Sequence, residues 1–179
     1  QFRPHPTKED LVVTVGAVTE QTLKRKGLET FVHAAGHARD LKFRLVGAHA
    51  PSALEILQKI APPNLEITGW ISDGELRDLL GRAKVYVQVS YNEGFGLALA
   101  EAMASGCVPV VTRMGSLPEV AGDVGFYVPY GDAMATASAV RDALASNRSA
   151  AARERIAARF PIGRRRERLL EIVAETMGC

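Results

Sequence analysis

The sequence predicts an α/β fold, with a Rossmann-like parallel sheet of about six strands and helices on both faces. Short apolar segments rich in β-branched residues alternate with segments of helical periodicity along almost the whole chain. The apolar segments are continuous, as in strands that are buried on both faces. The 179 residues are 47% hydrophobic and 23% charged, which is enough apolar sequence for one domain with a real core.

Each predicted strand is a short apolar run bounded by turn residues. The first, LVVTVGAV, is continuous and β-branched. The six strands are expected at residues 11–18, 42–48, 65–70, 84–90, 108–112 and 125–129. Parallel sheets of this kind bind ligands beyond the carboxyl ends of their strands. The loops that follow the first five strands are therefore the places where a binding site is expected.

Each predicted helix has apolar residues at helical spacing, and two of them begin with a capping-box pattern. Ser52 with Glu55, and Ser72 with Glu75, have that spacing. Helices are expected at 27–38, 52–61, 72–83, after residue 96, at 132–146 and at 164–177. The basic run 164–166 lies in the last of these. It is either a solvated helix face or a docking surface for another domain.

Composition excludes several classes of protein. A net charge of +2 gives no reason to expect nucleic-acid binding. The only cysteines, Cys107 and Cys179, do not suggest a disulfide framework, which favours a reducing, cytoplasmic setting. No signal peptide or membrane-spanning run is recognisable. We expect residues 1–10 to be a tether before one domain at 11–179, and we expect the chain, which opens with Gln1, to be a piece of a longer protein.

The stretch YNEGFGLALAEAMASGCVPVV carries the chemistry. Gly94 and Gly96 precede a helix whose free N–H groups and dipole attract phosphate. Glu101 places a charge within an otherwise apolar helix, where an unpaired carboxylate is costly. Glu93 stands at the tip of the preceding strand. Because carboxylates accept hydrogen bonds from sugar hydroxyls, the pair suits a nucleotide sugar. Alternatively, Glu101 pairs with a structural arginine and Glu93 is a solvated loop residue.

The segment EGFGLALAE resembles the E-x7-E signature of retaining glycosyltransferases with the two-domain GT-B fold, above all glycosyltransferase family 4. The similarity extends over about residues 11–145. It includes VGAVTEQTLKRKGLETFVHAA, LEITGWISDGELRDLLGRAKVYVQVSYNEGFG and EAMASGCVPVVTRMGSLPEVAGDVGFYVPYGD. The resemblance implies that the chain is the donor-binding half of such an enzyme. The N-terminal domain that holds most of the acceptor site would then be absent.

The resemblance also assigns roles to individual residues. It implies that Glu93 contacts the donor sugar beside the reacting carbon and that Glu101 binds the ribose hydroxyls. It implies that Trp70 and Ile71 form the turn whose main chain holds the base. The backbone expected to lie against the sugar and diphosphate belongs to Gly94, Phe95, Gly96 and Leu97.

One basic position departs from the family pattern. The resemblance implies that Lys26 neutralises the diphosphate. The family usually has an arginine directly after the glycine of the first strand, where this chain has Ala17. Lys24 or Arg25 could supply the missing cation, and Arg25 is our candidate for it.

The implied reaction moves a mannose- or glucose-type hexose, with retention, from a GDP- or UDP-linked donor to a glycan or lipid-linked acceptor. It needs no metal or other cofactor. His33 and His37 have a spacing that can bind metal, but without a third ligand nearby they read as a surface pair. A non-catalytic nucleotide-sugar binding module is the alternative function. An epimerase would need catalytic histidines that this sequence does not place.

Several residues near these motifs have structural interpretations. Glu119 is expected to brace a loop near the cleft, while its neighbours Gly115 and Ser116 could approach the donor. His49 follows the second strand and could line the cleft. The aromatic residues expected to pack in the core rather than stack on a ligand are Tyr86, Phe126 and Tyr127.

Overall fold

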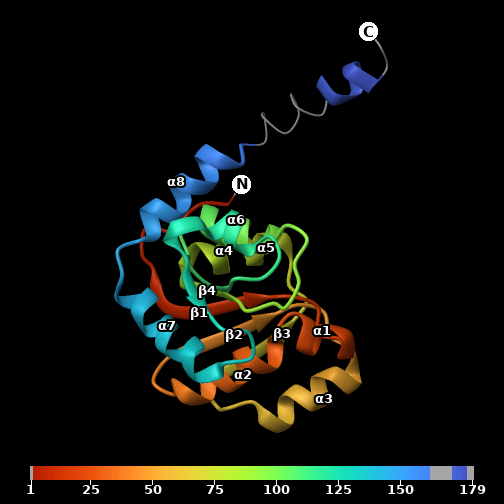
Figure 1. The fold of residues 1–179 in the computed structure, drawn as a ribbon. Coiled ribbons are helices and arrows are strands. Elements are labelled where there is room, and N and C mark those ends of the chain that lie inside the picture. The colour runs from red at the N-terminus through yellow and green to blue at the C-terminus, as the bar shows by residue number, and fades with distance from the viewer. Residues whose placement is uncertain (1, 162–170, 177–179) are drawn as a thin grey trace.

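A computed structural model of the chain describes residues 2–161 and 171–176. Residues 2–161 form one six-stranded sheet between two layers of helices (Figure 1). The strands are β1 (Glu9–Val15), β2 (Lys42–Val46), β3 (Leu65–Gly69), β4 (Ala83–Gln88), β5 (Val108–Thr112) and β6 (Phe126–Val128). The helices are α1 (Glu20–Arg25), α2 (Leu28–His37), α3 (Pro51–Ile60), α4 (Asp73–Arg82), α5 (Leu97–Ala104), α6 (Leu117–Ala121), α7 (Ala133–Ala145) and α8 (Ser149–Arg159). A short 3₁₀ helix, η1 (Gly122–Val124), follows α6.

The strand order is β3-β2-β1-β4-β5-β6, and all neighbouring strands are parallel. The predicted fold class is therefore confirmed, and every predicted strand lies within three residues of its expected bounds. From β1 the chain moves to β2 on one side, and from β4 it moves to β5 on the other. A sheet wound in this way leaves a crevice beyond the carboxyl ends of β1 and β4.

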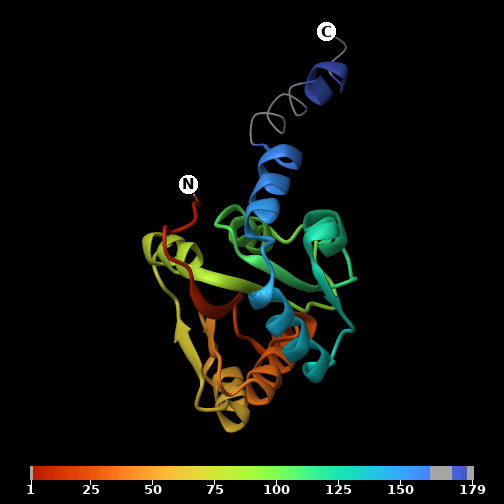
Figure 2. The ribbon, with the colours of Figure 1, turned by 90° about the vertical axis from the view of Figure 1, so that its left-hand side faces the viewer.

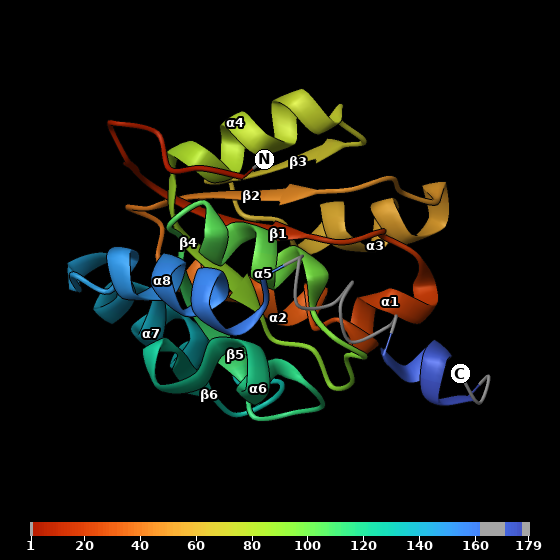
Figure 3. The same ribbon diagram turned by 90° about the horizontal axis from the view of Figure 1, so that it is seen from above.

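Successive residues of each strand point to opposite faces of the sheet, which gives the domain two apolar clusters. Val12 belongs to the cluster covered by α2, α3 and α7, and Val13 belongs to the one covered by α4, α5, α6 and α8. Figures 1 and 3 show the two helical layers on either side of the strands. The crevice is thus built on a sheet that is fixed from both faces.

Three helices were not predicted. A separate helix, α1, precedes α2, where one helix over 27–38 was expected. It begins with a capping box between Thr19 and Thr22, a polar pattern that gave little apolar periodicity to recognise. The others, α6 and α8, are respectively very short and largely polar.

The two predicted capping boxes have different outcomes. Ser72 caps α4, and its hydroxyl and N–H are both bonded to Glu75, as predicted. The prediction for Ser52 is wrong, because α3 begins one residue earlier at Pro51 and its N-cap is Ala50, without a side-chain cap. Proline fits the first turn of a helix since its missing N–H would have no partner there.

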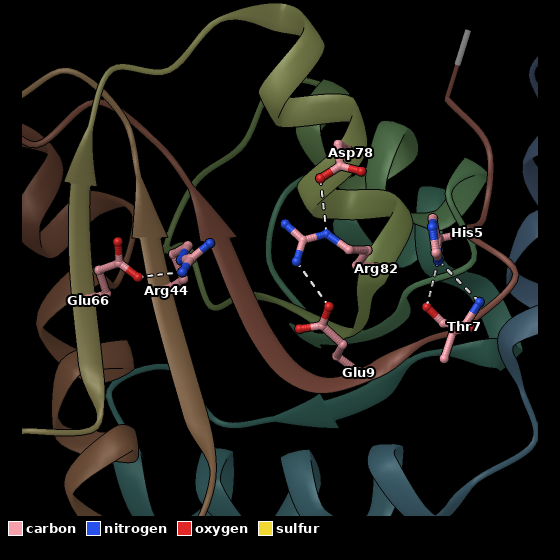
Figure 4. Close-up of polar contacts among 7 residues, drawn as sticks. All are labelled: His5, Thr7, Glu9, Arg44, Glu66, Asp78 and Arg82. Atoms are coloured by element: carbon pink, nitrogen blue, oxygen red, sulfur yellow. Dashed lines mark hydrogen bonds and ion pairs between the residues drawn. The ribbon is translucent and has the colours of Figure 1, made fainter.

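Most of the segment expected to be a tether is attached to the domain, so the boundary at residue 11 needs correction. Glu9 and Asp10 already belong to β1. His5 donates its backbone N–H to the carbonyl of Gly81, and Figure 2 shows this segment beside α4. Arg82 bridges Glu9 and Asp78 at 2.9 and 3.0 Å (Figure 4).

The partly buried ammonium of Lys8 secures this attachment. It donates to the carbonyls of Ala83 and Ser105 at 2.7 Å and to that of Leu80 at 3.4 Å. These carbonyls lie at the C-terminal ends of α4 and α5, where backbone carbonyls have no N–H donor from their own helix. Cys107 is buried and its thiol donates to two of the same carbonyls.

Toward the C-terminus, residues 171–176 are helical, in agreement with the predicted helix at 164–177 where it can be compared. The basic run 164–166 lies outside the described residues. No helix within 2–161 or 171–176 has both the length and the apolar character needed to cross a membrane.

Candidate functional site

Lys26 and Glu93 face each other at the crevice between β1 and β4. The Lys26 Nζ lies 3.9 Å from the Glu93 Oε2, and the two side chains are only 25% and 16% exposed. Lys26 is the residue at which α1 ends. Its alkyl chain passes over Gly16, where a Cβ would lie 3.2 Å from the Lys26 Cδ. The glycine at the end of β1 therefore leaves room for the lysine to reach the crevice.

The backbone on either side of Lys26 is fixed against β4. Gly27 has a φ of 65°, and a Cβ on it would lie 2.2 Å from the carbonyl oxygen of Val89. The N–H of Tyr91 donates to the carbonyl of Arg25 at 2.8 Å. The junction of α1 and α2 thus rests directly on the chain that leads to Glu93, which fixes the approach of the lysine to the glutamate.

Contacts from two other elements hold Glu93. Its carbonyl accepts from the N–H and the hydroxyl of Ser116, at 3.2 and 3.1 Å. Its Oε2 accepts from the Gln88 Nε2 at 2.7 Å. Gly115 and Ser116 were considered as residues that approach the donor, but here they contact the Glu93 backbone. Gln88 was not predicted, although a polar residue within the apolar run VYVQV was a signal for it.

The loop after Glu93 leads into α5 as expected of an anion site. Gly96 is the N-cap, with a φ of 85° and no side-chain cap. The first N–H groups of α5 are therefore left without a capping side chain. Around Gly94, no atom lies within 4 Å of the position that a Cβ would occupy, so a ligand can approach the backbone there.

Glu101 lies on α5 and is partly buried. Among the described residues, no hydrogen bond or ion pair to its carboxylate is found, so the alternative of a structural arginine partner has no support there. Burial raises the pKa of this carboxyl, and the charge of Asp73 on α4 raises it further. A partly buried carboxylate without a partner is available to accept hydrogen bonds from a ligand.

The side chains of the other residues predicted to contact the donor differ in exposure and packing. Trp70 follows β3 and is 75% exposed. Ile71 packs against the cluster under α4 and α5. The Phe95 ring contacts the ring of Phe160 edge-on, with centroids 5.4 Å apart, so its side chain packs beyond α8. Leu97 is 64% exposed.

The position where the family arginine is missing stays without an evident replacement. Ala17 is exposed, and its carbonyl accepts from the Thr22 hydroxyl. Lys24 and Arg25 are also exposed, and within the described residues neither cation has an ion pair. Their carbonyls, however, accept from Tyr130 and Tyr91.

The remaining aromatic and histidine residues have structural surroundings. Tyr86 is fully buried, in agreement with a core role. The rings of Tyr127 and Phe126 are covered by Arg113 and Arg148 at 4.1 and 4.4 Å. The exposed residues His33, His37 and His49 are not part of any cluster of three or more potential metal ligands within the described chain.

Two shallow hollows lie away from the Lys26–Glu93 pair. One, of about 330 Å³, is at the carboxyl ends of β5 and β6 and is lined by Arg113, Met114, Tyr127, Val128, Pro129 and Tyr130. The other, of about 440 Å³, lies along α8. Neither is lined by Glu93 or Glu101.

Similarity to known proteins covers most of the chain. Residues 9–146 match the model of the family described as glycosyl transferases group 1. The MMP α-(1→4)-mannosyltransferase of Mycolicibacterium hassiacum is 34% identical over 115 residues, which are 61% of this chain and 28% of that protein. The chain therefore spans less than a third of the length of this relative.

Solved structures show the same fold. The sucrose-phosphate synthase of Thermosynechococcus elongatus superposes with a TM-score of 0.85 and 26% identity, covering 99% of this chain and 50% of the synthase. Anabaena Alr3699/HepE in complex with UDP-glucose superposes with a TM-score of 0.81 and 17% identity, covering 93% of this chain and 49% of that one. In both cases the chain corresponds to about half of a longer protein.

Proposed function

Since this chain belongs to the group 1 glycosyl transferases, we propose that it is the donor-binding domain of a retaining hexosyltransferase. In this proposal a GDP- or UDP-linked mannose- or glucose-type donor binds at the crevice, and the acceptor is a glycan or a lipid-linked sugar. The mannosyltransferase activity named for one relative and the UDP-glucose in a structural neighbour support a nucleotide-sugar donor. The domain that holds the acceptor would be the part of the enzyme not covered by this chain.

One observation carries the proposal: the Lys26 Nζ lies 3.9 Å from the Glu93 Oε2, just before α5, whose N-cap Gly96 makes no side-chain cap hydrogen bond. Glycosyl transfer requires charge to be stabilised on the departing diphosphate while the anomeric carbon is held in place. Lys26 and the first N–H groups of α5 would take that charge. Glu93 would contact the donor sugar, and Glu101, without a protein partner, would accept from the ribose hydroxyls. No metal is required for these roles.

The alternative is a module that binds nucleotide sugar without turnover. Ala17 favours it, because this position lacks the family arginine and, within residues 2–161 and 171–176, neither Lys24 nor Arg25 has an ion pair that would hold it over the crevice. A binding module retains donor affinity but releases no nucleotide in the presence of any acceptor. The presence of both Glu93 and Glu101 favours the enzyme.

The test is calorimetric titration of the protein with UDP, GDP and ADP and with their glucose and mannose conjugates. Glu101→Ala is expected to lose at least tenfold in affinity for the one nucleotide that binds, since a buried hydrogen-bonded contact contributes about 1.5 kcal/mol or more. Asp142→Ala, an exposed carboxylate on α7, is the matched control and should bind like the wild type.

Turnover distinguishes the two functions. We expect the 179-residue chain alone to bind donor weakly and to transfer little, and the full-length protein to release nucleotide when acceptor is present. Absence of binding by every nucleotide would contradict both functions. Efficient transfer by the chain alone would show that the acceptor site is not on a separate domain.

A further inference from the structure

Gln88 is the last residue of β4 and is buried, with 6% of its surface exposed. Its neighbours in the strand, Val87 and Val89, belong to the apolar cluster on the other face of the sheet, so the Gln88 side chain points toward the face of α5 and α6. There it donates from Nε2 to the Oε2 of Glu93 at 2.7 Å.

This hydrogen bond makes the two oxygens of the Glu93 carboxylate different in their surroundings. Gln88 and Lys26 both approach Oε2, at 2.7 and 3.9 Å. Within the described residues, no hydrogen bond reaches Oε1. One oxygen is thus occupied by the protein, and the other is the one left for a ligand.

The same glutamine carries a cost. Its Oε1 is buried and has no hydrogen-bond partner among the described residues, and the same holds for the hydroxyl of Ser90 two positions later. A buried carbonyl oxygen without a donor destabilises the folded state, whereas an apolar side chain of the same shape would not. A residue that breaks a packing rule in this way is typical of a functional site.

We propose that Gln88 is a positioning residue for the donor chemistry, which fixes the Glu93 carboxylate through Oε2 so that Oε1 meets the donor sugar. This inference rests on the proposed function of the crevice. Three contacts then act on Glu93: Ser116 holds its backbone carbonyl, Gln88 holds its Oε2, and the Lys26 ammonium lies 3.9 Å from the same oxygen. A carboxylate that rotates freely would reach the productive geometry in only part of its orientations.

The decisive variant is Gln88→Met, which keeps the length of the side chain but removes both the donor and the unpartnered oxygen. A positioning role predicts that the melting temperature changes little, because removing the buried unpartnered oxygen offsets losing the hydrogen bond to the Glu93 carboxylate. It also predicts that kcat for nucleotide release from GDP-mannose or UDP-glucose falls by about 10- to 100-fold with KM changed less than about threefold. A structural role predicts the opposite: a lower melting temperature with kcat preserved.

A second variant and a control complete the experiment. Gln88→Glu has the same shape, but its carboxylate cannot donate to Glu93, so kcat should fall at least as far as in Gln88→Met. Thr136→Val removes a buried hydroxyl on α7, in the helical layer opposite α5 and α6, where it donates to the Asp132 carbonyl at 2.6 Å. It should lower the melting temperature and leave kcat unchanged.

The outcomes separate the inference from the proposed function. If the wild-type full-length protein releases nucleotide and both Gln88 variants keep kcat within twofold, the inference is wrong and the proposed function stands. If kcat falls only in proportion to a loss of folded protein, the inference is also wrong. If the wild-type protein neither binds nor turns over any donor, the proposed function itself fails.

Discussion

Ser116 holds Glu93 from the neighbouring loop: its N–H and its hydroxyl both donate to the Glu93 carbonyl, at 3.2 and 3.1 Å. The two residues are 23 positions apart, in the loops that follow β5 and β4. This contact makes the loop after β5 a support for the glutamate that we propose touches the donor sugar. A change in the loop after β5 is therefore expected to move Glu93.

Gly115→Ala tests that link. Gly115 has a φ of 55°, and a Cβ on it would lie 2.6 Å from the Glu93 carbonyl oxygen. We expect a loss of stability of about 2–4 kcal/mol from backbone strain and the displaced loop. We also expect a fall in nucleotide release of at least tenfold, because Glu93 moves. Thermal melting and a release assay at a temperature where the variant is folded measure the two effects.

Gly131→Ala is the matched control for this prediction. Gly131 has a φ of 81°, but no atom lies within 4 Å of its potential Cβ. It should cost only about 1–2 kcal/mol of backbone strain and leave nucleotide release unchanged. Equal activity losses in the two variants would show that strain alone, and not the contact with Glu93, is responsible.

Gly27→Ala should be one of the most damaging single substitutions. Gly27 has a φ of 65°, and a Cβ on it would lie 2.2 Å from the Val89 carbonyl oxygen. The substitution would therefore push the start of α2 away from the chain that follows β4. The expected cost is about 3 kcal/mol or more, together with loss of donor binding as Lys26 moves. Chemical denaturation and calorimetry measure the stability and the binding.

Gly36→Ala, in the same helix, should have the opposite effect. Gly36 has no atom within 4 Å of its potential Cβ, and alanine favours the helix by up to about 1 kcal/mol. A stabilised Gly36→Ala next to a strongly destabilised Gly27→Ala would locate the damage at the contact with Val89. Destabilisation of both to the same degree would contradict this explanation.

The pH dependence of stability should reveal the environment of Glu101. Its pKa is raised in the folded state by burial and by Asp73, so folding disfavours the ionised form. Its contribution to stability is therefore complete below the unfolded-state pKa of about 4.3 and is lost as the pH rises through the higher folded-state value. Glu101→Gln should raise the melting temperature slightly at pH 7, and this gain should vanish near pH 4.

Glu75 gives a control of opposite sign. Hydrogen bonds from Ser72 lower the pKa of its carboxyl, so its contribution is present above the unfolded-state pKa and is lost as the pH falls through the folded-state value. Glu75→Gln should therefore lower the melting temperature at pH 7, with the loss shrinking toward acid pH. Parallel pH profiles for the two variants would contradict the assignment.

Lys8→Met tests whether the N-terminal segment is part of the domain. Removing the ammonium leaves the carbonyl of Ser105 without its donor at 2.7 Å and weakens the ends of α4 and α5. The expected loss of unfolding free energy is about 2–3 kcal/mol, measured by urea denaturation. Lys59→Met, on the exposed surface of α3, should change it by less than about 0.5 kcal/mol. A free tether would make the two variants equal.

The fold was predictable because its signals are local. Continuous apolar runs such as VYVQV mark strands buried on both faces, and Ser72 with Glu75 marks a helix start. The failures are local as well. The polar helix α1 gave too little periodicity, and Pro51 began α3 ahead of the serine that was expected to cap it. Where the helical periodicity of the sequence is weak, tertiary packing decides where a short helix forms.

The sequence by itself determined the parallel sheet and the loops at its carboxyl edge. It also determined that Glu93, Gly96 and Glu101 lie on one loop and the helix that follows, because these residues are within eight positions of one another and form one local pattern. The tertiary structure alone decided that Lys26 meets Glu93 and that Gln88 and Ser116 hold it. Those contacts depend on β1 and β4 being neighbours in the sheet, with β5 next to β4. Strand order is set by the packing of the whole domain, which no single segment of the sequence encodes.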